Sequence, residues 1–193
     1  AKTEPRQWLP ILGAPEQTHY RNKLEFTCST KSYIPREQLH QENVTSDHPA
    51  MGYHAPRIFD KVIDIEECHL MDTVNNQIRN TIRTFVLDNH GSFYDIKEHT
   101  GWLRNVIVRY TTTGELMVNL CFGEERTEER IQLMNHLLAK VPCISTLLFT
   151  INPKHNDTIY DLTPEVFFGK GTITEQLGNL TFIISPKSFF QTN

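Results

Sequence analysis

The chain has 193 residues and a formal net charge of −4, and 38% of its residues are hydrophobic. This length suits one domain, which at ~150 residues buries about 70% of its unfolded surface and so has a substantial core. No apolar stretch approaches the ~20 residues of a membrane-spanning helix, and the opening AKTEPRQWLP lacks the apolar region of a signal peptide. We therefore expect a cytoplasmic protein with no membrane partner. The negative charge argues against a basic domain that binds nucleic acid strongly by itself.

The cysteines are spread along the chain, with no Cys-x-x-Cys pair of the kind that binds a metal. Cys28, Cys121 and Cys143 lie in apolar, strand-like runs. In a reducing compartment we expect these three to be buried free thiols. Cys68 differs, because it follows two glutamates at the junction of a predicted strand and a predicted helix.

The first part of the chain predicts strands. Residues 19–30 alternate between polar and apolar side chains, which indicates a strand with Arg21 and Lys23 on its polar face. After a polar loop, residues 50–54 and 59–66 predict two more strands.

Two stretches have the apolar periodicity of helices. The first carries its stripe from Val74 to Val86, with Asp72 as the expected N-cap and Gly91 as the residue just beyond the C-terminal end. The second covers residues 127–140 and stops before Pro142. Its expected inward-facing residues are Ile131, Met134, Leu137 and Leu138.

The remaining elements are strands. Residues 103–110 and 115–122 flank a Thr-Thr-Thr-Gly turn and predict a β-hairpin, and residues 145–152 predict another strand. A late meander is expected over three short runs, 166–168, 172–175 and 179–184. Because hairpins outnumber crossovers, the order predicts an α+β fold, with a mostly antiparallel sheet and two main helices packed on it.

The end of the chain is unusual. An apolar run, Leu180–Ile184, predicts a buried strand, and it leads into Ser-Pro, two phenylalanines and a glutamine before the sequence stops. Natural chain ends are usually polar and frayed. We therefore expect this chain to be a piece of a longer protein.

Three segments resemble the RNA uracil-5-methyltransferase family and occur in that family's order. Residues 184–193 (ISPKSFFQTN) are similar to the segment that opens its methyltransferase domain. Residues 20–23 (YRNK) resemble its Tyr-Arg-Asn-Lys strand. Residues 52–54 (GYH), with 57–68 (RIFDKVIDIEEC) after them, resemble its Gly-Phe-His and Val-(Val/Ile)-Asp-Ile-x-x-Cys segment.

The resemblance implies that residues 1–184 are the central domain of an S-adenosylmethionine-dependent enzyme that methylates C5 of a uridine in rRNA or tRNA. Residues 185–193 would begin the missing C-terminal methyltransferase domain. In this family the cysteine nucleophile and the carboxylate base lie in that downstream domain, so no catalytic residue is expected here. We expect the fragment to be inactive and monomeric, with RNA as the partner of the full-length protein.

The resemblance also assigns site residues in the tail. Gln191 would face both S-adenosylmethionine and the target base, and its amide can donate and accept hydrogen bonds. Phe189 and Phe190 would lie at the target base, where an aromatic ring can stack on an extruded nucleotide. Since neighbouring strand residues face opposite ways, we expect one phenylalanine in the core and the other free for the site.

Three further residues have proposed roles. Arg21 and Lys23 would contact the RNA backbone, with an ordinary solvated strand face as the alternative. Cys68 matches the fourth cysteine of a [4Fe–4S] cluster whose other three ligands lie upstream in the family. A cluster of that kind requires four thiolates, so Cys68 alone cannot hold one. The alternative is a buried structural thiol.

Two other functions stay open. The chain could be a free-standing RNA- or protein-binding module with no catalytic partner, which its negative charge favours. It could also be a different enzyme that uses Asp64 and Glu66 as paired carboxylates in a cleft.

Overall fold

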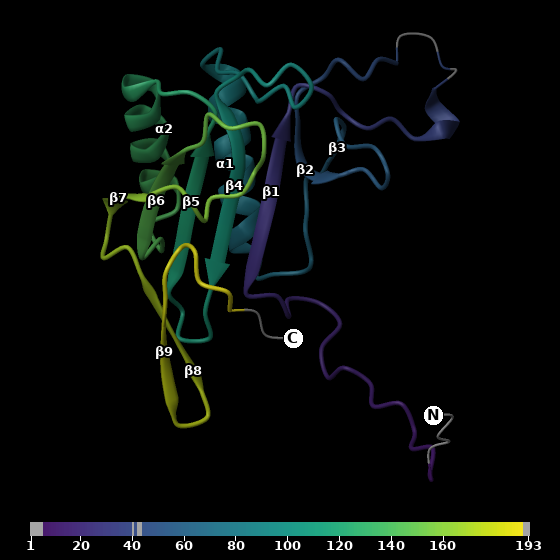
Figure 1. Ribbon diagram of the computed structural model, residues 1–193, viewed down its shortest axis with the longest axis vertical. Coiled ribbons are helices and arrows are strands. Elements are labelled where there is room, and N and C mark those ends of the chain that lie inside the picture. The colour runs from purple at the N-terminus through teal and green to yellow at the C-terminus, as the bar shows by residue number, and fades with distance from the viewer. Residues whose placement is uncertain (1–5, 40, 42–43, 191–193) are drawn as a thin grey trace.

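The computed structural model describes residues 6–39, 41 and 44–190. A seven-stranded sheet carries both α-helices on one face, and a two-stranded hairpin extends away from it (Figure 1). In chain order the elements are β1 (Lys23–Ser29), the 3₁₀ helix η1 (Arg36–Gln38), β2 (Ala50–His54), β3 (Val62–Asp64), α1 (Val74–Asp88), β4 (Leu103–Tyr110), β5 (Leu116–Phe122), α2 (Thr127–Lys140), β6 (Thr146–Ile151), β7 (Glu165–Phe168), β8 (Ile173–Leu177) and β9 (Leu180–Ile184).

The predicted α+β class is confirmed. The strand order is β3-β2-β1-β4-β5-β6-β7, and every neighbouring pair is antiparallel except β5 and β6. Those two strands are parallel because α2 connects them, and a parallel pair needs such a crossover. Among the described residues, no helix is both long and apolar enough to cross a bilayer.

The main core lies between the sheet and the helices. Alternate residues of the central strands face this side, and examples are Phe26, Val108 and Leu120, all fully buried. The helices contribute residues such as Ile82 and Leu137. The period-2 strands and the period-3.6 helices therefore meet along one continuous apolar layer.

The predicted ends of the first helix need correction. Its N-cap position is Thr73 rather than Asp72, although the Asp72 carboxylate accepts a hydrogen bond from the Val74 amide at 3.0 Å. At the other end His90, rather than Gly91, adopts the left-handed conformation, with φ at 56°. The Gly91 amide instead donates to the carbonyl of Val86 at 2.7 Å, so Gly91 closes the helix with ordinary backbone angles.

The second helix begins and ends as predicted, but its inward face is rotated. Ile131 is 40% exposed, whereas Leu133 is fully buried beside Met134 and Leu137. The buried stripe includes Arg130, whose guanidinium lies 3.7 Å above the Phe149 ring and pairs with Glu125. A pattern based only on apolar residues therefore misplaces the buried stripe, because one of its positions is an arginine.

Two predictions of burial were wrong. Strand β9 was expected to be buried, yet only its last residue, Ile184, is; Leu180 and Ile183 are 64% and 74% exposed. The reason is that β9 pairs with β8 alone, outside the main sheet. Cys143 is exposed because it lies in the turn between α2 and β6 rather than in a strand.

Candidate functional site

The C-terminal part of the chain covers most of the sheet face that the helices leave open. Residues 152–164 run across this outer face, where Ile159 packs on Ile107 and Cys121. Further along, Ile184 packs on Met117 of β5. Burial raises the pKa of the Cys121 thiol to about 12, so Cys121 is an inert packing residue and no nucleophile.

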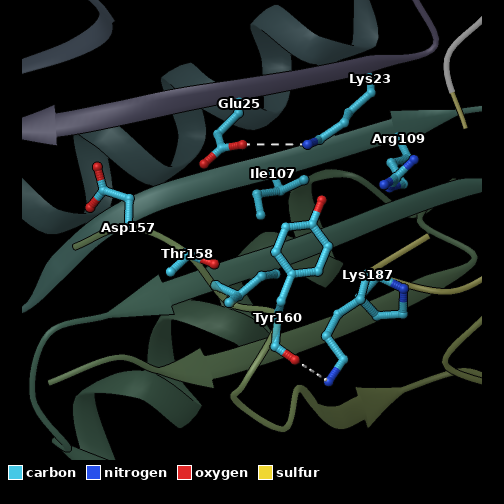
Figure 2. Close-up of a pocket in the computed structure, with 10 residues that line it drawn as sticks. Lys23, Glu25, Ile107, Arg109, Asp157, Thr158, Tyr160 and Lys187 are labelled. Carbon is cyan, nitrogen blue, oxygen red and sulfur yellow. Dashed lines mark hydrogen bonds and ion pairs between the residues drawn. The ribbon is translucent and has the colours of Figure 1, made fainter. Parts of the chain in front are cut away.

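A pocket of about 270 Å³ remains where this covering stops (Figure 2). Its floor is formed by outer-face residues of β1 and β4, and its walls are the covering loop and the start of the tail. The lining residues are Lys23, Glu25, Ile107, Arg109, Asp157, Thr158, Ile159, Tyr160, Pro186 and Lys187.

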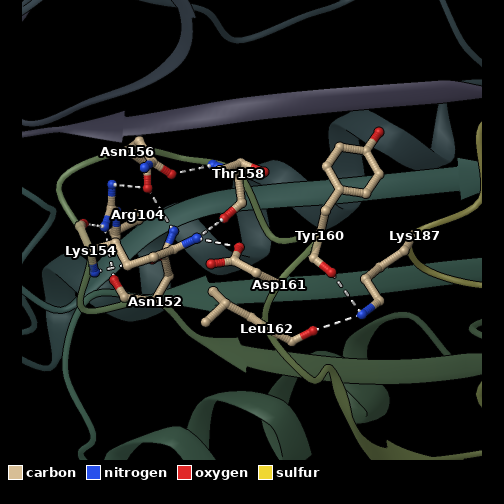
Figure 3. A network of polar contacts seen from close by, with 9 residues as sticks. All are labelled: Arg104, Asn152, Lys154, Asn156, Thr158, Tyr160, Asp161, Leu162 and Lys187. Atoms are coloured by element: carbon tan, nitrogen blue, oxygen red, sulfur yellow. Dashed lines mark hydrogen bonds and ion pairs between the residues drawn. The ribbon is translucent and has the colours of Figure 1, made fainter.

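One buried arginine holds the loop that forms a wall of this pocket (Figure 3). Arg104 of β4 is 2% exposed and donates hydrogen bonds to the carbonyls of Asn152 and Asn156, at 2.8 and 3.3 Å. Its guanidinium also donates to the Lys154 carbonyl and pairs with Asp157 at 2.7 Å. An arginine suits this role because its planar guanidinium carries five N–H donors, whereas one lysine ammonium could not reach so many acceptors.

A lysine ties the tail to the other end of the same loop. The Lys187 ammonium donates to the carbonyls of Tyr160 and Leu162, at 3.1 and 2.9 Å (Figure 3). The pocket wall is therefore fixed at both ends, by Arg104 on one side and by Lys187 on the other.

Arg109 fixes the tail from the sheet side. It lies in β4, is 4% exposed, and donates to the carbonyls of Ser188 and Phe190, the latter at 3.4 Å. Burial lowers the pKa of its guanidinium, but an arginine remains charged at neutral pH. Charged donors make stronger hydrogen bonds than neutral ones, so Arg109 is a firm anchor for the tail backbone.

The two phenylalanines separate as expected for neighbours in an extended segment. Phe190 packs with Phe182, their ring centres 5.5 Å apart, against the small cluster around Ile184. Phe189 is 89% exposed and is not part of that cluster. Their predicted contact with a target base stays a prediction, and Gln191 lies outside the described residues.

Two carboxylates attach the β8–β9 hairpin to the turn between β4 and β5. Glu115 binds the Thr174 hydroxyl at 2.6 Å and the Lys170 ammonium at 2.8 Å. Glu175, 3% exposed, accepts from the Thr112 amide at 3.0 Å. The hydrogen bonds from Lys170 and Thr174 lower the pKa of Glu115 to about 2.

The two residues that were predicted to contact the RNA backbone lie at the open margin of β1. Arg21 is exposed just before the strand, and Lys23 is its first residue. Both line a second hollow of about 390 Å³, together with Glu25, Leu24, Tyr53 and Leu70. Lys23 therefore borders both hollows, while its own ion pair with Glu25 is loose, at 3.5 Å.

Cys68 is buried and bonded within the domain. Its thiol lies 3.3 Å from the Tyr53 hydroxyl, and its amide donates to Asn76 at 2.8 Å. Across the described part of the chain, no three His, Cys, Asp or Glu side chains gather as metal ligands. These residues alone do not fit an iron–sulfur cluster, so the ligand role of Cys68 stays a prediction.

The alternative pair of catalytic carboxylates finds no support in the geometry. Asp64 forms an ion pair with Arg83 at 2.7 Å and accepts a hydrogen bond from the Met51 amide at 2.8 Å. Its oxygens therefore perform structural work at the edge of the sheet.

Several pocket residues could not be recognised from the sequence pattern. Glu25, Ile107, Tyr160 and Lys187 look like ordinary strand and loop residues in the sequence. Arg109 did carry a signal, because it interrupts the apolar run Val-Ile-Val-Arg-Tyr of a strand that is otherwise buried. A charged residue in such a run needs partners, and here they are carbonyls 79 and 81 positions further along.

Comparison with known proteins gives several relatives of one kind. The chain is 42% identical over its whole length to an uncharacterized RNA methyltransferase of Bacteroides thetaiotaomicron, and 38% identical to one of Porphyromonas gingivalis. It covers 43% and 42% of these two proteins, so it spans about two fifths of the length of the curated relatives it matches. No protein-family model matches it.

A solved structure shares the fold. The tRNA (uracil-54, C5)-methyltransferase of Pyrococcus abyssi, in complex with S-adenosyl-L-homocysteine, superposes with a TM-score of 0.68 at 22% identity. The match covers 95% of this chain and 39% of that one. The sheet, helices and covering segment described above therefore recur within a larger protein.

Proposed function

We propose that the chain is the central domain of an RNA uracil-5-methyltransferase, a proposal that its motifs and its similarity to uncharacterized RNA methyltransferases support. In this proposal the parent enzyme transfers a methyl group from S-adenosylmethionine to C5 of a uridine in rRNA or tRNA, in the cytoplasm. The domain positions the RNA and supplies one wall of the active site. Catalytic residues come from a further domain, so the chain alone is inactive.

The observation that carries the proposal is the presentation of the tail. Phe189 is 89% exposed, although the backbone on both sides of it is bound by the buried Arg109. The exposed ring lies where we expect the target base, next to a backbone that Arg109 anchors on both sides. Aromatic rings stack on bases that an enzyme has extruded from their helix, so a flipped uridine is a suitable partner.

The charge distribution also suits a domain that shares RNA binding with others. Net charge is −4, yet Arg21 and Lys23 stand together at the open margin of β1. Two or three phosphate contacts set the register of an RNA without giving strong binding. The rest of the affinity then has to come from other parts of the parent protein.

The test starts with the gene. We would read the frame on both sides of this segment, express the whole protein, and incubate it with radiolabelled S-adenosylmethionine and cellular RNA. The expected product is 5-methyluridine, and Phe189→Ala is expected to lower its rate of formation at least tenfold. A protein that ends with this segment, or that binds RNA without methylating it, would favour the free-standing binding module instead.

A further inference from the structure

The pocket beside the tail has a lining that phosphate contact does not explain. Of its cations, Lys187 is bound to the carbonyls of Tyr160 and Leu162, and Arg109 is bound to the tail. Both cations are therefore bonded to the protein itself, although the buried Nε–H of Arg109 has no hydrogen-bond partner among the described residues. Lys23, at the rim, is the pocket cation with the freest ammonium among the described residues, with one contact at 3.5 Å.

The pocket also contains carboxylate oxygens that can accept hydrogen bonds from a ligand. The Glu25 carboxylate lies on the floor with 38% of its side chain exposed, and it pairs with Lys23 at 3.5 Å. Asp157 uses one oxygen on Arg104 and stays half exposed at the wall. An ionised carboxylate accepts hydrogen bonds and donates none, so a ligand of this pocket must bring donors.

The rest of the lining suits a flat ring. Ile107 and Ile159 give an apolar floor and wall, and the Tyr160 ring, 67% exposed, stands beside them (Figure 2). A volume of about 270 Å³ is slightly below the ~300 Å³ at which small-molecule pockets begin, so its size suits one heterocycle rather than a larger ligand.

We propose that this pocket binds one unpaired guanine of the RNA, a nucleotide near the methylated uridine. Guanine carries two adjacent donors on its Watson–Crick edge, which one carboxylate can accept together, and Glu25 is placed to do this. Tyr160 stacks on the base, and Lys23 meets the neighbouring phosphate. The proposal rests on the RNA function above and adds to it the base that the domain reads.

The pocket is also linked to the tail. Arg109 and Lys187 both line it, and both bind main-chain carbonyls of the loop or of the segment around Phe189. A base in the pocket would therefore lie against the same side chains that orient the exposed ring.

The experiment is an NMR titration of the 193-residue chain, uniformly labelled with ¹⁵N. The probes are GMP, IMP, UMP and inorganic phosphate, followed by the trinucleotides UGU, UIU and UUU. We expect GMP to shift the amides of Glu25, Ile107 and Thr158, with IMP, which lacks the 2-amino group, ~10-fold weaker. UGU should bind more tightly than GMP and at least ~10-fold more tightly than UUU.

Two variants sharpen the result. Glu25→Gln keeps the size of the side chain but sets an amide against the guanine donors, so the preference for GMP over UMP should disappear. The control is Glu165→Gln, an exposed glutamate on β7, which should leave both affinities unchanged. Loss of the preference in the control as well would mean that the charge, and not the position, matters.

The outcomes separate this inference from the RNA function. Equal binding of all three trinucleotides would overturn the guanine pocket and leave RNA binding intact. Binding of GMP with none of the trinucleotides would overturn both assignments for this surface. Identical shifts from inorganic phosphate would show an anion site and would also refute the guanine reading.

Discussion

Arg109 and Ser188 join the middle of the sheet to the end of the described chain. The guanidinium of Arg109, buried in β4, donates to the Ser188 carbonyl across a sequence separation of 79 residues. The same side chain reaches the carbonyl of Phe190. One buried residue therefore anchors the tail backbone on both sides of Phe189.

Replacing Arg109 should release the tail. In Arg109→Met the two carbonyls lose their charged donor, and we expect faster amide hydrogen exchange over residues 185–190, with a loss of unfolding free energy of ~1–3 kcal/mol. Exchange measured by mass spectrometry checks this. Arg36→Met, at an exposed arginine of η1, is the control and should leave the tail protected. An unchanged tail in Arg109→Met would show that packing of Phe190 is sufficient.

The two phenylalanines should respond in opposite ways. Phe190→Ala removes the contact with Phe182 and part of a small cluster, so thermal or urea unfolding should show a loss of ~1–3 kcal/mol. Phe189→Ala should change stability by less than ~0.5 kcal/mol, because the ring is exposed, while it slows methyl transfer in the full-length protein. Each variant controls the other. The reverse pattern would contradict the assignment of Phe189 to the site.

Arg104 should be essential for the pocket wall. Arg104→Lys keeps the charge but cannot reach the carbonyls of Asn152 and Asn156 together with the Asp157 carboxylate. We expect a loss of ~2–4 kcal/mol and faster hydrogen exchange over residues 152–162. Asp157→Asn keeps the carbonyl contacts and should cost less than half as much. Equal losses in the two variants would mean that the ion pair, and not the carbonyl fork, holds the loop.

The attachment of the hairpin should depend on pH through Glu115. Its pKa is lowered from 4.5 to about 2 in the folded protein, so its contribution to stability is complete above pH ~4.5 and is lost as the pH falls toward 2. Glu115→Gln should therefore be less stable than the parent at pH 7, by ~1–2 kcal/mol, with the difference shrinking below pH 4. Urea unfolding at pH 7, 4 and 3 measures it. Glu165→Gln should show no such trend; a constant difference for Glu115→Gln would contradict the lowered pKa.

Charge reversal at the margin of β1 tests the RNA contacts. The double variant Arg21→Glu, Lys23→Glu should bind RNA more weakly, and the slope of log K against log salt should become shallower by roughly 1.4–1.8, the value for two phosphate contacts. Fluorescence anisotropy at several salt concentrations measures the slope. The control, Arg36→Glu with Lys97→Glu, changes the net charge equally at exposed positions. Equal effects of the two pairs would reduce the result to a general charge effect.

The elements were predictable because their signals are local. The side chains that face the core set the alternation within β4 and β5 and the apolar stripe of α1. The hairpin turn between the two strands contains Gly114, with φ at 81°. The errors arose where the packing of nearby side chains determines which residue is buried. Ile131 was expected inside, but the buried Arg130 and Leu133 take that side of α2.

The candidate site was only partly predictable. The order of the motifs was sufficient to indicate a resemblance to one family, and the tail was singled out by its phenylalanines and glutamine. The pocket was missed, because Glu25, Arg109, Tyr160 and Lys187 come from four segments far apart in the chain. Their proximity depends on the covering loop folding back over β4 and β5.

By itself the sequence determined the α+β class, the order of helices and strands, a resemblance to RNA methyltransferases, and the expectation that one phenylalanine of the tail is core and one is free. Those properties follow from side-chain periodicity and from short motifs, both of which act over a few neighbouring residues. Only the tertiary structure decided that Phe189 is the free one, that β9 is exposed, and that a pocket lies beside β1. The loop and the tail depend on hydrogen bonds from buried arginines to carbonyls about 50 to 80 residues away, and no local pattern encodes such partners. The exposure of β9 depends on its pairing with β8 alone, outside the main sheet.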